Sequence, residues 1–247
     1  MTAGPTTRYA VYFSPPSDSQ WWRFGSRFLG RDAITGARLA HPAVAGLAAR
    51  EISLITKKPR QYGFHATLKA PFRLACSPAD FFRRAETIAA DCKALALPPL
   101  RLTVLDAFIA LTPSARMPEI EELAAKCAVE FDDLRAPASV QEIEKRRVCG
   151  LTRRQDEQLR KWGYPFVFDD FRFHFTLTGR LRETDRRRVI AALEPVISGI
   201  NREPLRVDAF TLFAQDADSP FVAHRRCHFD GTVEVYRRIE ARDQCQN

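Results

Sequence analysis

The sequence predicts an α+β protein of two pseudo-symmetric lobes, each an antiparallel sheet with helices on its outer face and a cleft between the lobes. A tetrapeptide of the pattern His-x-Thr-Leu occurs twice, at His65 and at His174, 109 residues apart. Each copy is followed by helical periodicity and then by a proline-led strand, so one strand–helix–strand unit is repeated. If a two-fold relates the two units, the histidine strands can face each other across the cleft.

Elements of the first half follow from alternating hydrophobic periods of two and of 3.6 residues. Ser77-Pro78 is typical of a helix start, with a hydroxyl cap and a proline at the first position, and Gly30 is typical of a helix end. The expected elements, in order, are a strand at 9–13, a helix capped by Asp18 or Ser19 that ends near Gly30, a helix within 43–55, the first histidine strand at 62–69, a helix from Ser77, and strands at 100–105 and 107–111.

The second half repeats this order of strand, helix and strand after a less regular segment. Thr184-Asp185 is a helix start, and the apolar residues that follow it recur at helical spacing. The expected elements, in order, are a helix after Pro118, helical stretches at 141–147 and 153–161, the second histidine strand at 171–178, a helix from Thr184, a strand within 204–212, and a last strand at 231–236.

Length and composition are those of a folded chain with a substantial core, since 247 residues are 45% hydrophobic. We expect a single bilobal domain over 1–247. The first repeated unit spans about 57–113, the second spans about 166–214, and a helical segment at 114–165 lies between them.

The charge balance favours an anionic partner, because the formal net charge is +8. The basic residues are dispersed in short runs without a basic tail, so nucleic acid is possible as a partner but not favoured. The sequence has neither a long apolar run nor a charged-then-apolar leader, so we expect a cytoplasmic protein that does not enter membranes. Six cysteines without a close CxxC pair indicate reduced thiols.

Strand alternation places polar groups beside both histidines. Side chains two residues apart on a strand share a face. His65, Thr67 and Lys69 therefore point one way in the first strand, and the second strand presents a matching set: Arg172, His174, Thr176 and Thr178. Two strands that each offer an imidazole beside a hydroxyl make an acid–base pair with its own anion-binding groups.

This pair fits the cleavage of a phosphodiester. One imidazole can take a proton from water and the other can protonate the departing oxygen, since the unperturbed pKa lies near 6.5. Thr67 and Thr176 can donate hydrogen bonds to the non-bridging oxygens. Lys69 and Arg172 are candidate cations for a developing dianion or a second phosphate. Further candidate binding residues are Tyr12, Thr178, Trp162 and Tyr164. No metal or cofactor is expected, because two imidazoles without a nearby carboxylate fall short of a catalytic zinc site.

The paired motifs resemble those of the 2H phosphoesterase superfamily, which is named for two H-x-[ST]-x motifs. The longer contexts, YGFHATLKAPF at 62–72 and FRFHFTLTGR at 171–180, are similar to one branch of it, encoded beside the carbon–phosphorus lyase genes of phosphonate breakdown. That resemblance implies a metal-independent hydrolase that opens 5-phosphoribosyl 1,2-cyclic phosphate to ribose 1,5-bisphosphate.

Two alternatives stay open. The first is an enzyme of the same fold that acts on a 2′,3′-cyclic nucleotide or an RNA end. The second is a protein that binds RNA or a cyclic nucleotide without turnover, although binding alone does not require two groups able to exchange protons. The expected partner is a small phosphorylated cyclic sugar or nucleotide substrate. The sequence leaves the oligomeric state open, as well as which histidine acts as the base.

Overall fold

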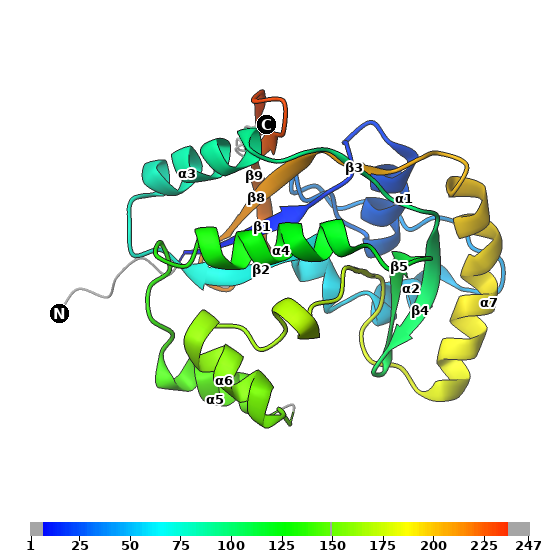
Figure 1. Cartoon of the computed structure of the whole chain (residues 1–247). Helices are drawn as coiled ribbons and strands as arrows, with labels where there is room; N and C mark the ends of the chain where they lie inside the picture. Colours follow the sequence, from blue (N-terminus) through cyan, green and yellow to red (C-terminus); the bar gives the residue numbers. More distant parts are fainter. Residues whose placement is uncertain (1–6, 149, 237–247) are drawn as a thin grey trace, which may run out of the picture.

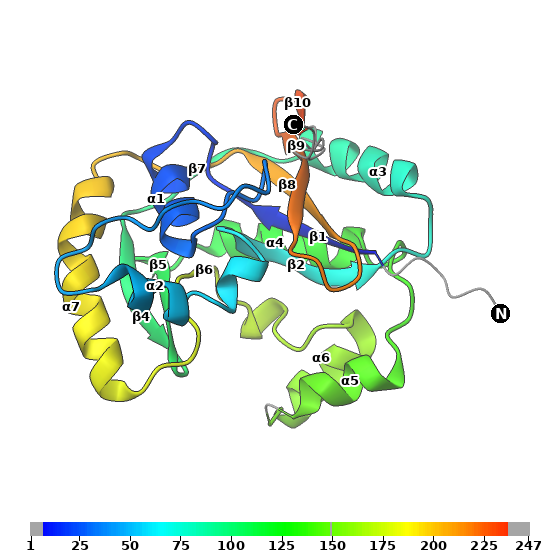
Figure 2. The same cartoon turned by 180° about the vertical axis from the view of Figure 1, so that it is seen from behind.

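The computed structural model describes residues 7–148 and 150–236. Within this part of the chain the strands are β1 (Arg8–Phe13), β2 (Ala66–Arg73), β3 (Leu95–Ala96), β4 (Leu100–Leu105), β5 (Phe108–Pro113), β6 (Phe175–Thr176), β7 (Arg206–Val207), β8 (Ala209–Gln215), β9 (Val222–His228) and β10 (Val233–Val235). They form one eight-stranded antiparallel sheet with the order β10-β9-β8-β1-β2-β6-β5-β4, and β3 pairs with β7 (Figures 1 and 2).

The helices lie close to their predicted positions. They are α1 (Gln20–Leu29), α2 (Ala49–Ile55), α3 (Pro78–Ala90), α4 (Pro118–Glu130), α5 (Val140–Arg147), α6 (Arg153–Trp162) and α7 (Glu183–Ile200), with short 3-10 turns η1 (Pro59–Gln61) and η2 (Phe168–Asp170). However, α7 begins at Glu183, one residue before the predicted start at Thr184, and has no side-chain cap. The Ser19 side chain accepts a hydrogen bond from the backbone N–H of Trp22, and Gly30 ends α1 with a φ of 77°. Ser77 caps α3 in the same way through Asp80.

The large sheet presents two different faces. Inward-facing residues of the strands pack with buried residues of α1, α3, α4 and α7 in one core, which includes Val11, Leu68 and Phe175. The opposite face carries a smaller apolar cluster around Tyr12. The second face is therefore the one on which polar side chains near the middle of the sheet can meet a substrate.

A single continuous sheet replaces the two separate antiparallel sheets that the repeated units predict. β2 and β6, which carry the two motifs, are neighbours at its centre. Each unit packs its helix on the other unit's strands, because α3 lies against β8 and β9 whereas α7 lies against β4 and β5. The α+β class is confirmed, but this exchange of strands and helices joins the two halves through one sheet.

The first histidine strand is displaced along the chain from its predicted range, and the second is shorter than predicted. β2 begins at Ala66, and β6 contains only two residues, so each motif histidine comes directly before its strand. The backbone N–H groups of Leu177 and Thr178 both donate to the carbonyl of Ile109, at 2.9 and 3.2 Å. Two donors on one carbonyl interrupt the regular ladder with β5 and end β6 at this point.

α5 and α6 form a pair beyond β2, where Glu142 of α5 pairs with Arg73 of β2 at 3.1 Å (Figures 1 and 2). Both helices begin with a capping box, at Ser139 for α5 and at Thr152 for α6. Arg147 on α5 forms an ion pair with Asp156 on α6, with 2.6 Å between Nε and Oδ1. This pair lies in the segment 114–165, which the sequence predicts as helical.

The cysteines in the described residues carry free thiols, as expected, with Cys127 and Cys227 buried. Cys149 and Cys245 lie outside those residues. Among the helices that the structure describes, none combines the length and the apolar character needed to span a membrane.

Candidate functional site

The two motifs lie side by side in antiparallel register. Ala66 pairs with Phe175, and both of these residues are buried on the core side. Continuing this register places Thr67 opposite His174 and Thr176 opposite His65. Each histidine therefore faces the threonine of the other motif, and the two imidazoles occupy diagonal positions, about 7–8 Å apart at the backbone. Both imidazoles line the same cavity.

Backbone carbonyls orient both imidazoles in the same way. The Nδ1 atom of His65 lies 2.9 Å from the carbonyl oxygen of Gly63, and that of His174 lies 2.7 Å from the carbonyl oxygen of Arg172. Since a carbonyl can only accept, Nδ1 carries a hydrogen and donates in each ring. The neutral Nε2 atoms are then free to accept a proton. Nε2 of His65 is also 3.4 Å from the Thr67 hydroxyl.

His65 lies in the more enclosed surroundings. Its ring stacks on Tyr12, with 3.8 Å between the centroids and 23° between the planes. Burial lowers the pKa of His65 to about 4, and the nearby His174 also lowers it, although the hydrogen bond to Gly63 raises it. Burial also raises the pKa of the Tyr12 phenol well above its usual value. Tyr12 therefore supports His65 as a neutral aromatic ring, in line with its predicted place in the site.

His174 has a different neighbour on its side of the sheet. Phe108 of β5 lies 5.8 Å from its ring, at an interplanar angle of 44°. Burial lowers the pKa of His174, while the hydrogen bond to Arg172 acts in the opposite direction. Burial thus favours the neutral form of both imidazoles.

A cavity of about 580 Å³ contains both motifs. Its lining includes His65, Thr67, His174 and Thr176, the four residues that the sequence identifies as the reactive set. A second cavity of about 460 Å³ shares Thr67, His174 and Tyr164 with it, so the two are neighbouring parts of one site. These volumes are typical of small-molecule sites.

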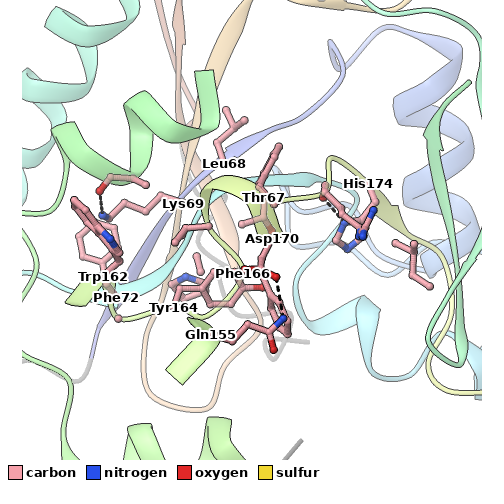
Figure 3. A pocket seen from close by; sticks show the side chains of 18 of the residues that line it. Thr67, Leu68, Lys69, Phe72, Gln155, Trp162, Tyr164, Phe166, Asp170 and His174 are labelled. Atoms are coloured by element: carbon pink, nitrogen blue, oxygen red, sulfur yellow. Dashed lines mark hydrogen bonds between the residues drawn. The ribbon is translucent and has the colours of Figure 1, made fainter. Parts of the chain in front are cut away.

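Lys69 does not lie beside His65 and Thr67 as alternation predicts. Tyr12 pairs with Thr67 but Val11 pairs with Lys69, so Leu68 is an extra residue that forms a β-bulge. The bulge turns Lys69 onto the core side, where its ammonium group donates to the carbonyl of Ala128 at 2.7 Å. Figure 3 shows Lys69 directed towards α4 and away from His174, with Thr67 between them.

The buried ammonium group of Lys69 serves the fold. It also lies 3.4 Å from Asp132, and burial lowers its pKa, with Asp132 partly offsetting that effect. Lys69 thus ties β2 to the end of α4. It also lines the second cavity, and its predicted contact with a substrate phosphate stays a prediction.

Thr178 is buried in the fold, whereas Arg172 is exposed at the second cavity. The hydroxyl of Thr178 accepts a hydrogen bond from the N–H of Ile109 at 3.0 Å and donates to the carbonyl of Gly179 at 2.9 Å. With only 1% of its surface exposed, Thr178 lines the cavity but uses its hydroxyl inside the fold. The Arg172 side chain is exposed at the second cavity, while its carbonyl orients His174. Substrate binding by Arg172 stays a prediction.

The segment that follows α6 forms a wall of the site. Tyr164 lines both cavities and Trp162 lines the second one, and their predicted contact with a substrate stays a prediction. Figure 3 shows Tyr164 and Phe166 side by side, and their ring centroids are 5.6 Å apart. Trp162 packs edge-on against Phe168 at 5.2 Å.

Two lining residues, Arg8 and Arg146, are absent from the sequence-based selection. Arg8 precedes the apolar part of β1 and Arg146 belongs to a charged run on α5, so neither stands beside a motif. Strand alternation could have predicted that Arg8 lines the cavity, because Arg8 shares a strand face with Tyr12. The local sequence could not have predicted the same for Arg146, because its distance from the cavity depends on how α5 packs. In the described residues, no three His, Cys, Asp or Glu side chains gather as a metal site.

Comparison with known families identifies the chain. A family model described as "Protein of unknown function (DUF1045)" matches residues 67–222. The chain belongs to the DUF1045 family. The matched region covers the second motif entirely and begins within the first.

Two curated relatives of this DUF1045 protein are described as "Ribose 1,5-bisphosphate phosphokinase PhnN". The protein of Janthinobacterium sp. (strain Marseille) is 37% identical over 235 residues, which cover 92% of this chain and 52% of that protein. The protein of Laribacter hongkongensis (strain HLHK9) is 37% identical over 210 residues, covering 84% and 48%. The chain therefore spans about half the length of these relatives.

Proposed function

We propose that this protein is a metal-independent phosphodiesterase of phosphonate breakdown that opens 5-phosphoribosyl 1,2-cyclic phosphate to ribose 1,5-bisphosphate. Water attacks the phosphorus of the cyclic diester, a new P–O bond forms, and the bond from phosphorus to O2 of the ribose breaks. The water loses a proton and O2 gains one. The observation that carries the proposal is the paired register, in which each motif histidine lies across from the other motif's threonine.

The two histidines supply the proton transfers. His65, whose pKa of about 4 keeps it neutral, is the general base, and its Nε2 takes the proton from the attacking water. His174 is the general acid: the negative charge of a bound substrate raises its pKa, so its Nε2 carries a proton for the departing O2. The hydroxyls of Thr67 and Thr176 donate to the non-bridging oxygens, on which charge accumulates.

The names of the relatives support the choice of substrate. Ribose 1,5-bisphosphate is the product of the proposed ring opening, and it is also the compound in the printed name of both proteins. In a chain that carried both activities, the kinase half would consume the ribose 1,5-bisphosphate that the ring-opening half makes. The resemblance of both motif contexts to the phosphonate-operon branch supports the same compound.

A kinase is the second candidate, favoured by the printed name itself. Those proteins are about twice as long as the matched region, so the name does not assign kinase activity to this half. An enzyme that opens a 2′,3′-cyclic nucleotide is the third, because the same acid–base pair would serve it.

One experiment separates these candidates. The purified protein is incubated with 5-phosphoribosyl 1,2-cyclic phosphate, with a 2′,3′-cyclic nucleotide, and with ribose 1,5-bisphosphate plus ATP, and each reaction is followed by phosphorus NMR with and without EDTA. We expect opening of the first compound at the same rate in both conditions. Faster opening of the nucleotide, consumption of ATP alone, or loss of activity in EDTA that zinc or manganese restores would each overturn the proposal.

A further inference from the structure

The cavity that holds both motif histidines is strongly cationic. Its charged lining residues, apart from the histidines, are Arg8, Lys58, Lys145, Arg146, Arg180 and Glu142. The single carboxylate is already engaged, because Glu142 pairs with Arg73 at 3.1 Å and accepts from the backbone N–H of Ser139 at 2.7 Å. The cavity therefore carries an excess of positive charge that its own side chains do not neutralise.

Arg8 and Arg146 stand out among these cations because both are half-buried. The Arg8 guanidinium donates through Nε and Nη2 to the Gln215 side-chain oxygen, a neutral acceptor. The Arg146 guanidinium lies 5.1 Å from the centre of the Tyr164 ring. Within the described residues neither has a carboxylate at ion-pair distance, unlike the adjacent Arg147, which pairs with Glu144 and Asp156.

The two guanidinium groups act on each other. Burial lowers the pKa of Arg146 and the positive charge of Arg8 lowers it further, whereas Tyr164, Glu142 and Tyr62 act in the opposite direction. Two like charges held half-buried without an anion destabilise each other, and a dianion bound between them would relieve that repulsion. The Gln215 contact and the Tyr164 ring hold the two groups in place before any ligand arrives.

The position of this pair fits a second phosphate on the same substrate. Arg8 and Tyr12 are four residues apart on β1 and share its face, and Tyr12 stacks on His65. Both arginines influence the pKa of the Tyr12 phenol, which they lower against the larger effect of burial. The cationic pair thus lies near the ring that supports His65, within one cavity.

We propose that Arg8 and Arg146 form a phosphomonoester subsite that holds the 5-phosphate of the substrate while the two histidines act on its cyclic diester. The inference rests on the proposed function and names the groups that select its substrate. The subsite would bind the second phosphate, for which the sequence suggests Lys69 and Arg172 as candidate cations. Because Arg146 comes from α5, the subsite is complete only when the α5–α6 pair lies against the sheet.

The test uses Arg146→Gln and Arg8→Gln, with Arg153→Ala as the matched control. Arg153 lies on α6 with 94% of its side chain exposed and does not line either cavity, so the control removes one positive charge elsewhere. For each protein, kcat/KM is measured on 5-phosphoribosyl 1,2-cyclic phosphate and on the analogue without the 5-phosphate. Thermal melts verify that each variant is folded.

The preference for the phosphorylated compound should fall roughly 10- to 100-fold in each glutamine variant and stay at the parent value in the control, because each loses a charge-assisted contact. An unchanged preference in both glutamine variants would overturn the subsite while leaving the ring opening intact.

If the parent opens neither compound, the proposed function fails and the subsite is decided by binding. Binding of ribose 5-phosphate is then measured by titration calorimetry. The subsite is supported if the parent and the control bind ribose 5-phosphate at least tenfold more tightly than the glutamine variants do. Equal affinities, or no binding by the parent, overturn it.

Discussion

The half-buried imidazole of His65 makes folding stability depend on pH. Its pKa is about 4 in the folded protein against 6.5 for an unperturbed histidine. The unfolded chain therefore binds a proton between these values that the folded protein excludes, so stability is fully present above pH 6.5 and is lost as the pH falls towards 4. Each pKa unit corresponds to about 1.4 kcal/mol, so the whole effect is about 3 kcal/mol, of which about 2 kcal/mol is lost between pH 7 and pH 5.

Replacing His65 by alanine removes this term. We expect the free energy of unfolding of the parent to fall by about 2 kcal/mol more between pH 7 and pH 5 than that of His65→Ala. Urea unfolding at the two pH values, followed by circular dichroism, measures both differences, and taking the difference between proteins cancels the titration of all other groups. Equal losses in the parent and the variant would refute the argument, as would a ring pKa of 6.5 or above for His65 in an NMR titration.

Three other predictions concern turnover and packing. His65→Ala and His174→Ala should each lower kcat on the cyclic substrate by roughly a hundred-fold or more while the proteins stay folded at pH 7, and full activity in either variant would contradict the two-histidine mechanism. The pH profile of kcat/KM should be bell-shaped with its maximum between about pH 4 and 6.5, since burial lowers the pKa of both rings; a maximum above pH 7 would contradict the assigned roles. Gly25→Ala should lower the free energy of unfolding by about 1–3 kcal/mol in a denaturant melt, because the new methyl would lie 2.1 Å from the Phe64 ring. Gly199→Ala, with open space around it in α7, should have a free energy of unfolding equal to or above that of the parent. Equal stability of the two variants would contradict this.

Signals that act over a few residues could be predicted from the sequence. The caps at Ser19 and Ser77, the helix end at Gly30, and the shared face of His65 and Thr67 all follow from neighbouring residues, and the structure has them. The meeting of the two motifs also follows, because a repeated unit implies related positions.

Features that depend on pairing between distant strands could not be predicted in this way. The bulge at Leu68 exists because β1 pairs with β2 in a shifted register, and it alone moves Lys69 away from Thr67. The approach of Arg146 likewise depends on the packing of α5. The periodic pattern within each strand contains no information on either event.

The sheet order also gives the two motifs different surroundings. By register the motifs are interchangeable, since each histidine faces the other's threonine. Their outer neighbours differ, because β1 borders β2 and brings Tyr12 into stacking contact with His65, whereas β5 borders β6 and brings Phe108 to 5.8 Å from His174. We propose that this contrast, together with the charge of His174 acting on His65, lowers the pKa of His65 and so makes His65 the base. If so, Tyr12→Ala should admit water to His65 and raise its pKa towards 6.5 in an NMR titration, while Phe108→Ala should leave it near the parent value. An unchanged pKa in Tyr12→Ala would show that the asymmetry has another origin.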